Sequence, residues 1–163
     1  MLGASPQIKR GSKALGIPVE ALHASLDELA AREPRIAAAL KHAGYPQPRS
    51  SERGYMTLLR TIVGQQVSIK AAASMWAKLE AALGGDFSPA AVLAASDEAL
   101  RGAGLSRQKM SYARSLAEEV RSGRLDLDRL AEADEAAIDE LVRIRGIGRW
   151  SAEVYLLFAE GRA

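Results

Sequence analysis

Apolar residues recur along the chain at the intervals typical of α-helices. Two stripes stand out, the first at Leu58, Leu59, Ile62 and Val63 and the second at Ile69, Ala72, Ala73, Trp76, Leu79 and Leu83. Alanine is abundant, β-branched residues are scattered, and no alternating run of strand length occurs. The pattern predicts an all-α fold in which two core helices meet at a corner, Gly64-Gln65-Gln66-Val67.

Capping residues and glycines divide this pattern into helices. Ser68 stands where the second core helix should begin, and Gly84-Gly85 should end it. Further helix starts are expected at Pro18, Ser25, Pro34, Ser88, Ser96, Ser106 and Asp134. Residues 1–17 are small, polar and basic, so we expect a flexible N-terminal tail followed by one helical domain over 18–163.

The last part of the pattern is interrupted by Gly146-Ile147-Gly148, between a helix expected over 135–144 and another that begins near Arg149. The second helix would start with unbonded backbone N–H groups, and glycines allow a bulky anion to approach them. Arg149 and Ser151 would add a cation and a hydroxyl, while Ile147 would pack into the core. The stretch is typical of a phosphate-sized anion site, or alternatively of an ordinary helix stop and restart.

Composition narrows the class of protein. With 163 residues the chain is one domain, or one domain plus a tail, and its apolar runs are too short to span a bilayer. It contains no cysteine, and its histidines, His23 and His42, lie far apart, so neither a disulfide nor a thiolate or histidine metal site is expected. The N-terminus lacks the apolar stretch of a signal peptide. We expect a cytoplasmic, bacterial-type protein without a membrane partner.

Charge is unevenly distributed although the net charge is only +2. Residues 101–125 hold six basic and two acidic side chains, residues 126–140 hold one basic and seven acidic ones, and basic residues return from 141 onward. Two basic stretches divided by an acidic one are compatible with an anionic partner that touches chosen faces. A solvated surface of mixed charge would give the same counts.

Three stretches together resemble a known family. Residues 141–152 read LVRIRGIGRWSA, which resembles the helix-hairpin-helix signature of the HhH-GPD superfamily of DNA base-excision glycosylases, and within it the 3-methyladenine DNA glycosylase II (alkylbase) branch. Upstream, residues 64–68 read GQQVS and residues 102–109 read GAGLSRQK, in the order and at the spacing of that branch. The similarity covers about residues 50–163.

The resemblance implies how the chain would hold double-stranded DNA. The N–H groups of Gly146 and Gly148 would bind the phosphate backbone, helped by Arg149 and Ser151. Gln66 would enter the duplex from the minor groove and fill the gap left by a base that has rotated out. A polar turn residue is the simpler explanation of Gln66.

The same family often holds a monovalent cation near the hairpin. The main-chain carbonyls of Val142, Ile144 and Gly146 would bind a structural Na⁺ or K⁺ here, and no other cofactor is implied.

Trp150 occupies the position at which bifunctional members of the superfamily carry a nucleophilic lysine. Tryptophan cannot form a Schiff base, so the resemblance implies a monofunctional enzyme that hydrolyses the N-glycosidic bond. In the alkylbase branch this tryptophan lines the base pocket, where its ring would attract a positively charged alkylated base. A tryptophan packed under the hairpin is the structural alternative, and Tyr155 and Phe158 are expected in the core.

The chain departs from the family at the catalytic residue. The family's Asp follows the second hairpin helix, which would place it shortly after Ala163, and none of Glu153, Glu160, Asp134 and Asp139 matches its role. The resemblance implies a domain that lacks its C-terminal helices, and a fragment inactive by itself.

The function implied is a monomeric, nucleoid-associated DNA glycosylase of base-excision repair that flips and removes alkylated bases such as 3-methyladenine. The alternatives are a non-enzymatic DNA-binding helix-hairpin-helix module and a glycosylase of the same superfamily for a different lesion.

Overall fold

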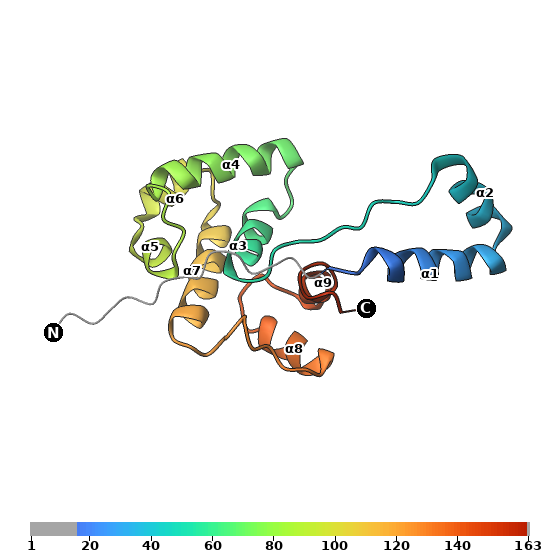
Figure 1. Cartoon of the computed structure of the whole chain (residues 1–163). Helices are drawn as coiled ribbons and strands as arrows, with labels where there is room; N and C mark the ends of the chain where they lie inside the picture. Colours follow the sequence, from blue (N-terminus) through green and yellow to red (C-terminus); the bar gives the residue numbers. More distant parts are fainter. Residues whose placement is uncertain (1–15, 163) are drawn as a thin grey trace.

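The structure is a computed structural model that describes residues 16–162, and within that range it is helical with no strand (Figure 1). Its helices are α1 Val19–Arg32, α2 Pro34–Ala43, α3 Tyr55–Gly64, α4 Ile69–Ala82, α5 Pro89–Ala94, α6 Asp97–Gly102, α7 Arg107–Arg121, α8 Asp134–Leu141, α9 Arg149–Tyr155 and the π-helical segment η1 Leu156–Glu160. The prediction of an all-α fold is confirmed. Over 16–162, no helix combines the length and the apolar character needed to cross a membrane.

Serine side chains start four of these helices, as the sequence predicts. Ser68, Ser88, Ser96 and Ser106 each accept a hydrogen bond, at 3.1 to 3.2 Å, from the backbone N–H three positions further on. Each bond satisfies a donor that the first helical turn would otherwise leave unpaired. These four helix starts are therefore determined locally.

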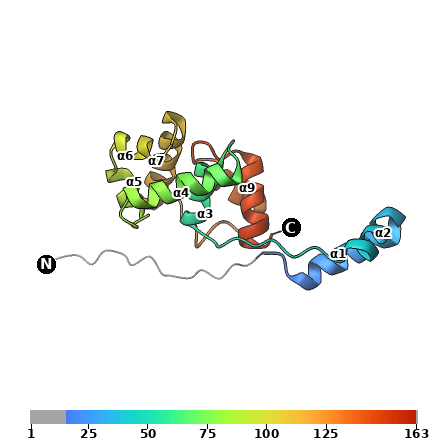
Figure 2. The same ribbon diagram turned by 90° about the horizontal axis from the view of Figure 1, so that it is seen from above.

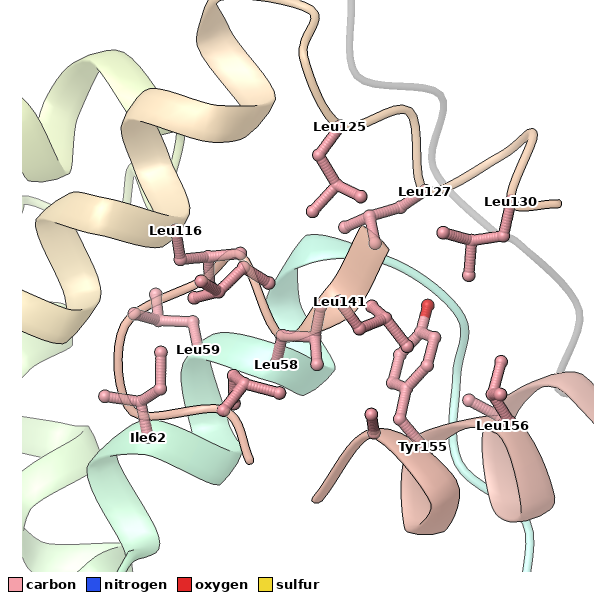
Figure 3. Packing of buried hydrophobic residues seen from close by; sticks show 14 of the residues in the cluster. Leu58, Leu59, Ile62, Leu116, Leu125, Leu127, Leu130, Leu141, Tyr155 and Leu156 are labelled. Atoms are coloured by element: carbon pink, nitrogen blue, oxygen red, sulfur yellow. The ribbon is translucent and has the colours of Figure 1, made fainter. Parts of the chain in front are cut away.

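The core lies where α3 meets α7, α8 and α9. Leu58, Leu59 and Ile62 of α3 are fully buried and gather with Leu116 of α7 and Leu141 of α8 (Figure 3). Residues 125–130 close the cluster with three more leucines, and a smaller second cluster joins α4, α6 and the start of α7. Since burying a leucine side chain contributes about 1.5–3 kcal/mol, this junction holds the later helices in place.

Helices α1 and α2 pack on each other and stand away from the other helices (Figures 1 and 2). Neither helix contains a buried residue. The prediction that Ser25 caps a separate helix is wrong, because α1 runs through this position without a break. The predicted tail lies outside the described residues up to residue 15, and Gly16 is buried.

Two further expectations need correction. Ile69 was expected in the core but is 91% exposed, because α4 packs with one side on α3 and α6 and buries only Leu79. The helix expected over 135–144 ends at Leu141. Beyond it, Ile144 N–H donates to Leu141 O at 3.1 Å and Ile147 N–H to Ile144 O at 3.0 Å, so tight turns replace the last helical turn.

Candidate nucleic-acid interface

Two buried isoleucines anchor the connection between α8 and α9 in the core. Ile144 and Ile147 are both buried in the main core cluster, one on each side of the turn. This confirms the prediction that Ile147 packs into the core and holds the two helices together. The glycines on either side of it are half-buried or exposed.

Gly146 is required by the fold itself. Its φ of +84° lies in the left-handed region that favours glycine, and a Cβ built there would overlap the ring of Tyr112. Helix α7 also supports the neighbouring residue, since Arg145 N–H donates to Ser115 Oγ at 3.1 Å. The turn therefore rests on α7 through a ring and a hydroxyl, contacts that nothing in the sequence pattern indicated.

Gly148, unlike Gly146, is not required by the fold. Its φ of −89° and ψ of 173° are extended values that any residue adopts, and the space at its Cβ position is open. Within residues 16–162, neither Gly146 N–H nor Gly148 N–H has a hydrogen-bond acceptor, and no side chain caps α9. Two backbone donors at this turn are thus left for an acceptor from outside the protein.

Arg149 follows these donors but is engaged by carboxylates. Its Nη1 and Nη2 donate to the two oxygens of Glu135, at 2.8 and 2.5 Å, and its Nε donates to Glu153 at 2.8 Å. Hydrogen bonding and attraction, first from Glu135 and then from Glu153, raise the pKa of Arg149, and the same contact lowers that of Glu135. A phosphate would have to compete with two carboxylates for this guanidinium, so its predicted role in binding remains a prediction. Ser151, half-buried on the same helix, has no side-chain hydrogen bond among the described residues.

The corner between α3 and α4 lies next to this turn. Gln65 Nε2 donates to the carbonyl oxygen of Gly146 at 2.7 Å, which joins residues 81 positions apart in the sequence. Gln66 is exposed, and at φ +55° it is the one non-glycine residue with positive φ in the described part of the chain. The structure thus brings Gln66 close to the hairpin, while the role of Gln65 was missed because a contact between distant segments leaves no local pattern.

Lys109, part of the third stretch singled out by the sequence, supports the same corner. Its Nζ donates to the carbonyl oxygen of Val63, in the last turn of α3, at 2.7 Å, and burial lowers its pKa. Gly104, at φ +91°, lies against Met75 of α4. The third stretch therefore contacts α3 and α4 beside the corner, and the corner in turn contacts the hairpin.

The predicted cation ligands differ in their hydrogen bonds. The carbonyl of Gly146 accepts from Gln65, and that of Ile144 accepts from Ile147 N–H, whereas that of Val142 has no partner within 16–162. Each carbonyl oxygen keeps a further lone pair, so binding of Na⁺ or K⁺ remains a prediction. The described residues contain no cluster of His, Cys, Asp and Glu side chains suited to a metal ion.

Trp150 is 74% exposed, which excludes the alternative of a tryptophan packed under the hairpin. Tyr155, one turn further along α9, is buried as expected, and its hydroxyl accepts from Gly54 N–H at 2.7 Å. Burial is the main cause that raises the pKa of Tyr155 to about 12. The hairpin therefore presents one large aromatic ring to solvent beside the two unbonded amides.

Three of the carboxylates near the hairpin are held by arginines. Glu160, with a side chain only 4% exposed, pairs with Arg53 at 2.7 Å, and Asp134 lies 3.4 Å from Arg162. Glu153 pairs with Arg149 as described above. These pairings agree with the interpretation that such acids hold the structure together and do not act on a substrate.

Known proteins are similar to this chain in both sequence and fold. DNA-3-methyladenine glycosylase 1 of Schizosaccharomyces pombe is 32% identical over 124 residues, covering 72% of this chain and 54% of that protein. A DNA-3-methyladenine glycosidase structure from Bacillus halodurans matches with a TM-score of 0.71 at 38% identity, covering 82% of this chain and 63% of that one. An S. pombe 3-methyladenine DNA glycosylase in complex with abasic DNA matches with a TM-score of 0.70 at 28% identity, covering 83% and 69%.

The chain spans about half the length of the curated relatives it matches, 54% of one and 40% of another. The family model for HhH-GPD superfamily base excision DNA repair proteins matches residues 59–153, from the middle of α3 into α9. This range contains the corner, the support from α7 and the hairpin. The chain therefore belongs to the HhH-GPD superfamily of base excision DNA repair proteins.

Proposed function

We propose that this chain holds double-stranded DNA by its hairpin as part of a monofunctional glycosylase that hydrolyses the N-glycosidic bond of alkylated bases such as 3-methyladenine. The observation that carries the proposal is the pair of unbonded amides at Gly146 and Gly148, with an exposed Trp150 beside them. Backbone amides bind phosphate oxygens without reading sequence, which suits a protein that must search undamaged DNA.

The hairpin, Gln66 and Trp150 have separate roles in this proposal. The hairpin amides bind the phosphates of one strand, and Gln66, exposed at the adjacent corner, enters the stack as the damaged nucleotide rotates out. The ring of Trp150 then attracts the positive charge of an alkylated base, which is worth about 0.5–2 kcal/mol. A neutral base gains less from the same ring, so the charge of the lesion supports selectivity.

Bond cleavage needs a carboxylate that stabilises the positive charge developing on the sugar and assists the attack of water. The Asp expected shortly after Ala163 would supply it, and that position remains a prediction. Because water is the co-reactant, the reaction would need no cofactor, and a chelator should leave the rate of base release unchanged. An alkylated purine already has a weakened glycosidic bond, so acid catalysis on the base is not required.

The names of the relatives support the substrate class. The curated relatives are named DNA-3-methyladenine glycosylases, and one structural relative is in complex with abasic DNA, the product that base hydrolysis leaves behind. We further propose that the protein acts as a monomer in the cytoplasm, associated with the nucleoid. Sedimentation as a dimer at working concentration would contradict the monomer.

The test is base release by the full protein from three duplexes, carrying 3-methyladenine, oxidised guanine or no damage. Release from the first duplex alone supports the proposal. Release from oxidised guanine alone would assign a different lesion, and tight binding to all three duplexes without release would assign a DNA-binding module.

A further inference from the structure

One hydrogen bond joins the corner that carries Gln66 to the hairpin. Gln65 Nε2 donates to the Gly146 carbonyl oxygen at 2.7 Å, across 81 residues of sequence. Within residues 16–162 it is the one hydrogen bond that connects residues 64–68 with the α8–α9 turn. This bond is the direct link between the two segments proposed to touch DNA.

The accepting carbonyl belongs to the peptide unit between the two unbonded amides. The Gly146 oxygen receives Gln65, and the N–H of the same peptide unit, that of Ile147, donates to Ile144 O at 3.0 Å. Both polar groups of this unit are therefore bonded within the protein, while the amides of Gly146 and Gly148 on either side are not. Gln65 is thus bonded to the centre of the proposed phosphate-binding turn.

The backbone of the corner separates the two glutamines. Gln65 has φ −57° and ψ 133° and is half-buried, whereas Gln66, at φ +55°, is exposed. Such a change of backbone conformation between neighbours directs one side chain toward the hairpin and leaves the next one free for solvent. Gln65 therefore contacts the hairpin, whereas the side chain of Gln66 is available to contact DNA.

Helix α7 supports each partner separately. Lys109 Nζ holds the end of α3 through Val63 O at 2.7 Å, and Ser115 Oγ accepts from Arg145 N–H at 3.1 Å. Without Gln65 the hairpin would still rest on α7 and keep its amides unbonded. What would be lost is the one hydrogen bond that orients the corner directly against the phosphate-binding turn.

We propose that Gln65 is a positioning residue that sets the position of Gln66 relative to the bound phosphate, so that binding of the strand places the probe at the base stack. The inference rests on the proposed DNA-binding function and adds a residue that acts through Gln66 and the hairpin. A side chain aimed at a fixed point loses less freedom during opening than one on an independently moving corner.

The experiment compares Gln65→Met, which keeps the length of the side chain and removes its donor, with Gln47→Met as a matched control. Gln47 is exposed in the loop between α2 and α3, where the described residues offer its side chain no hydrogen bond. Each variant and the wild-type chain are titrated onto a duplex with an abasic-site analogue beside 2-aminopurine. Fluorescence anisotropy reports affinity, and 2-aminopurine emission reports opening of the stack.

For Gln65→Met we expect opening at saturation to fall by about two- to twelvefold, the factor that one neutral hydrogen bond contributes. Affinity should fall by less than about twofold, because the amides and the support from α7 remain. The control should match the wild type in both signals.

Unchanged opening in Gln65→Met would overturn the proposal, and so would an equal loss of affinity and opening, since that pattern belongs to a residue that only stabilises the scaffold. A wild-type chain that does not bind the duplex would instead refute the proposed function, so the two failures are distinguishable.

Discussion

Replacing Gly148 by aspartate should separate folding from DNA binding. Gly148 is the residue before the first turn of α9, its backbone is extended, and its Cβ position is open. A carboxylate at this position can accept hydrogen bonds from the first turn, which at present has no side-chain cap. The change therefore improves the start of the helix while it places a negative charge at the amides proposed to bind phosphate.

The two effects have opposite signs. An acidic group at a helix start contributes about 0.3–1 kcal/mol, so the free energy of unfolding should stay equal or rise slightly. When the carboxylate keeps the phosphate away, each of the two amides loses a hydrogen bond to a charged group, which is worth about 1.5–3 kcal/mol. Losing both, with added repulsion, should weaken DNA binding by about a hundredfold or more at matched salt.

Gly146→Ala provides the contrasting variant. A non-glycine residue held at positive φ costs about 1–3 kcal/mol, and displacing the ring of Tyr112 adds about 1–3 kcal/mol. This variant should therefore unfold at clearly lower urea concentration, whereas Gly148→Asp should not.

Urea unfolding and fluorescence anisotropy on the same preparations measure both quantities. Unchanged affinity in a folded Gly148→Asp variant would refute the reasoning, because the unbonded amides would then have no role in binding. Destabilisation of Gly148→Asp by more than about 1 kcal/mol would equally contradict the open space seen at that position.

Three further outcomes are expected. Trp150→Ala should leave stability within about 0.5 kcal/mol and reduce base release by the full protein more than DNA binding; equal losses would make it a binding residue only. Glu135→Gln should free the two terminal nitrogens of Arg149, while its Nε stays paired with Glu153. DNA binding should strengthen with a salt slope steeper by about one, measured by anisotropy against Asp139→Asn on the same helix. Glu160→Gln should lower the free energy of unfolding by about 1–3 kcal/mol in urea, because it leaves a half-buried arginine without its carboxylate.

Local features of this protein were predictable from the sequence. Helix starts at Ser68, Ser88 and Ser106 depend on a hydroxyl and an N–H three residues apart, so a short window contains all the information. The burial of Ile147 was also predictable from the sequence, because an apolar side chain in a turn between two amphipathic helices packs into the core that they share.

Two predictions that depend on neighbours from elsewhere in the chain were wrong in part. Of the apolar stripe predicted on α4, Leu79 is buried, whereas Ile69 and Ala73 are exposed, because no helix within residues 16–162 covers that part of α4. Likewise, α8 ends at Leu141 although the apolar pattern continues to Ile144, since tight turns bury that residue as well as a helix would. Periodicity records which residues are apolar, while burial depends on what packs against them.

The sequence by itself determined that the described part of this chain is helical, where most of its helices begin, and that a glycine turn lies between the last two. Only the tertiary structure decided which glycine the fold requires, that Arg149 is held by Glu135, and that Gln65 reaches the hairpin. The physical reason is the range of the interactions. A cap or a turn is made within a few residues, whereas a contact across 81 residues exists only after the core has brought both segments together.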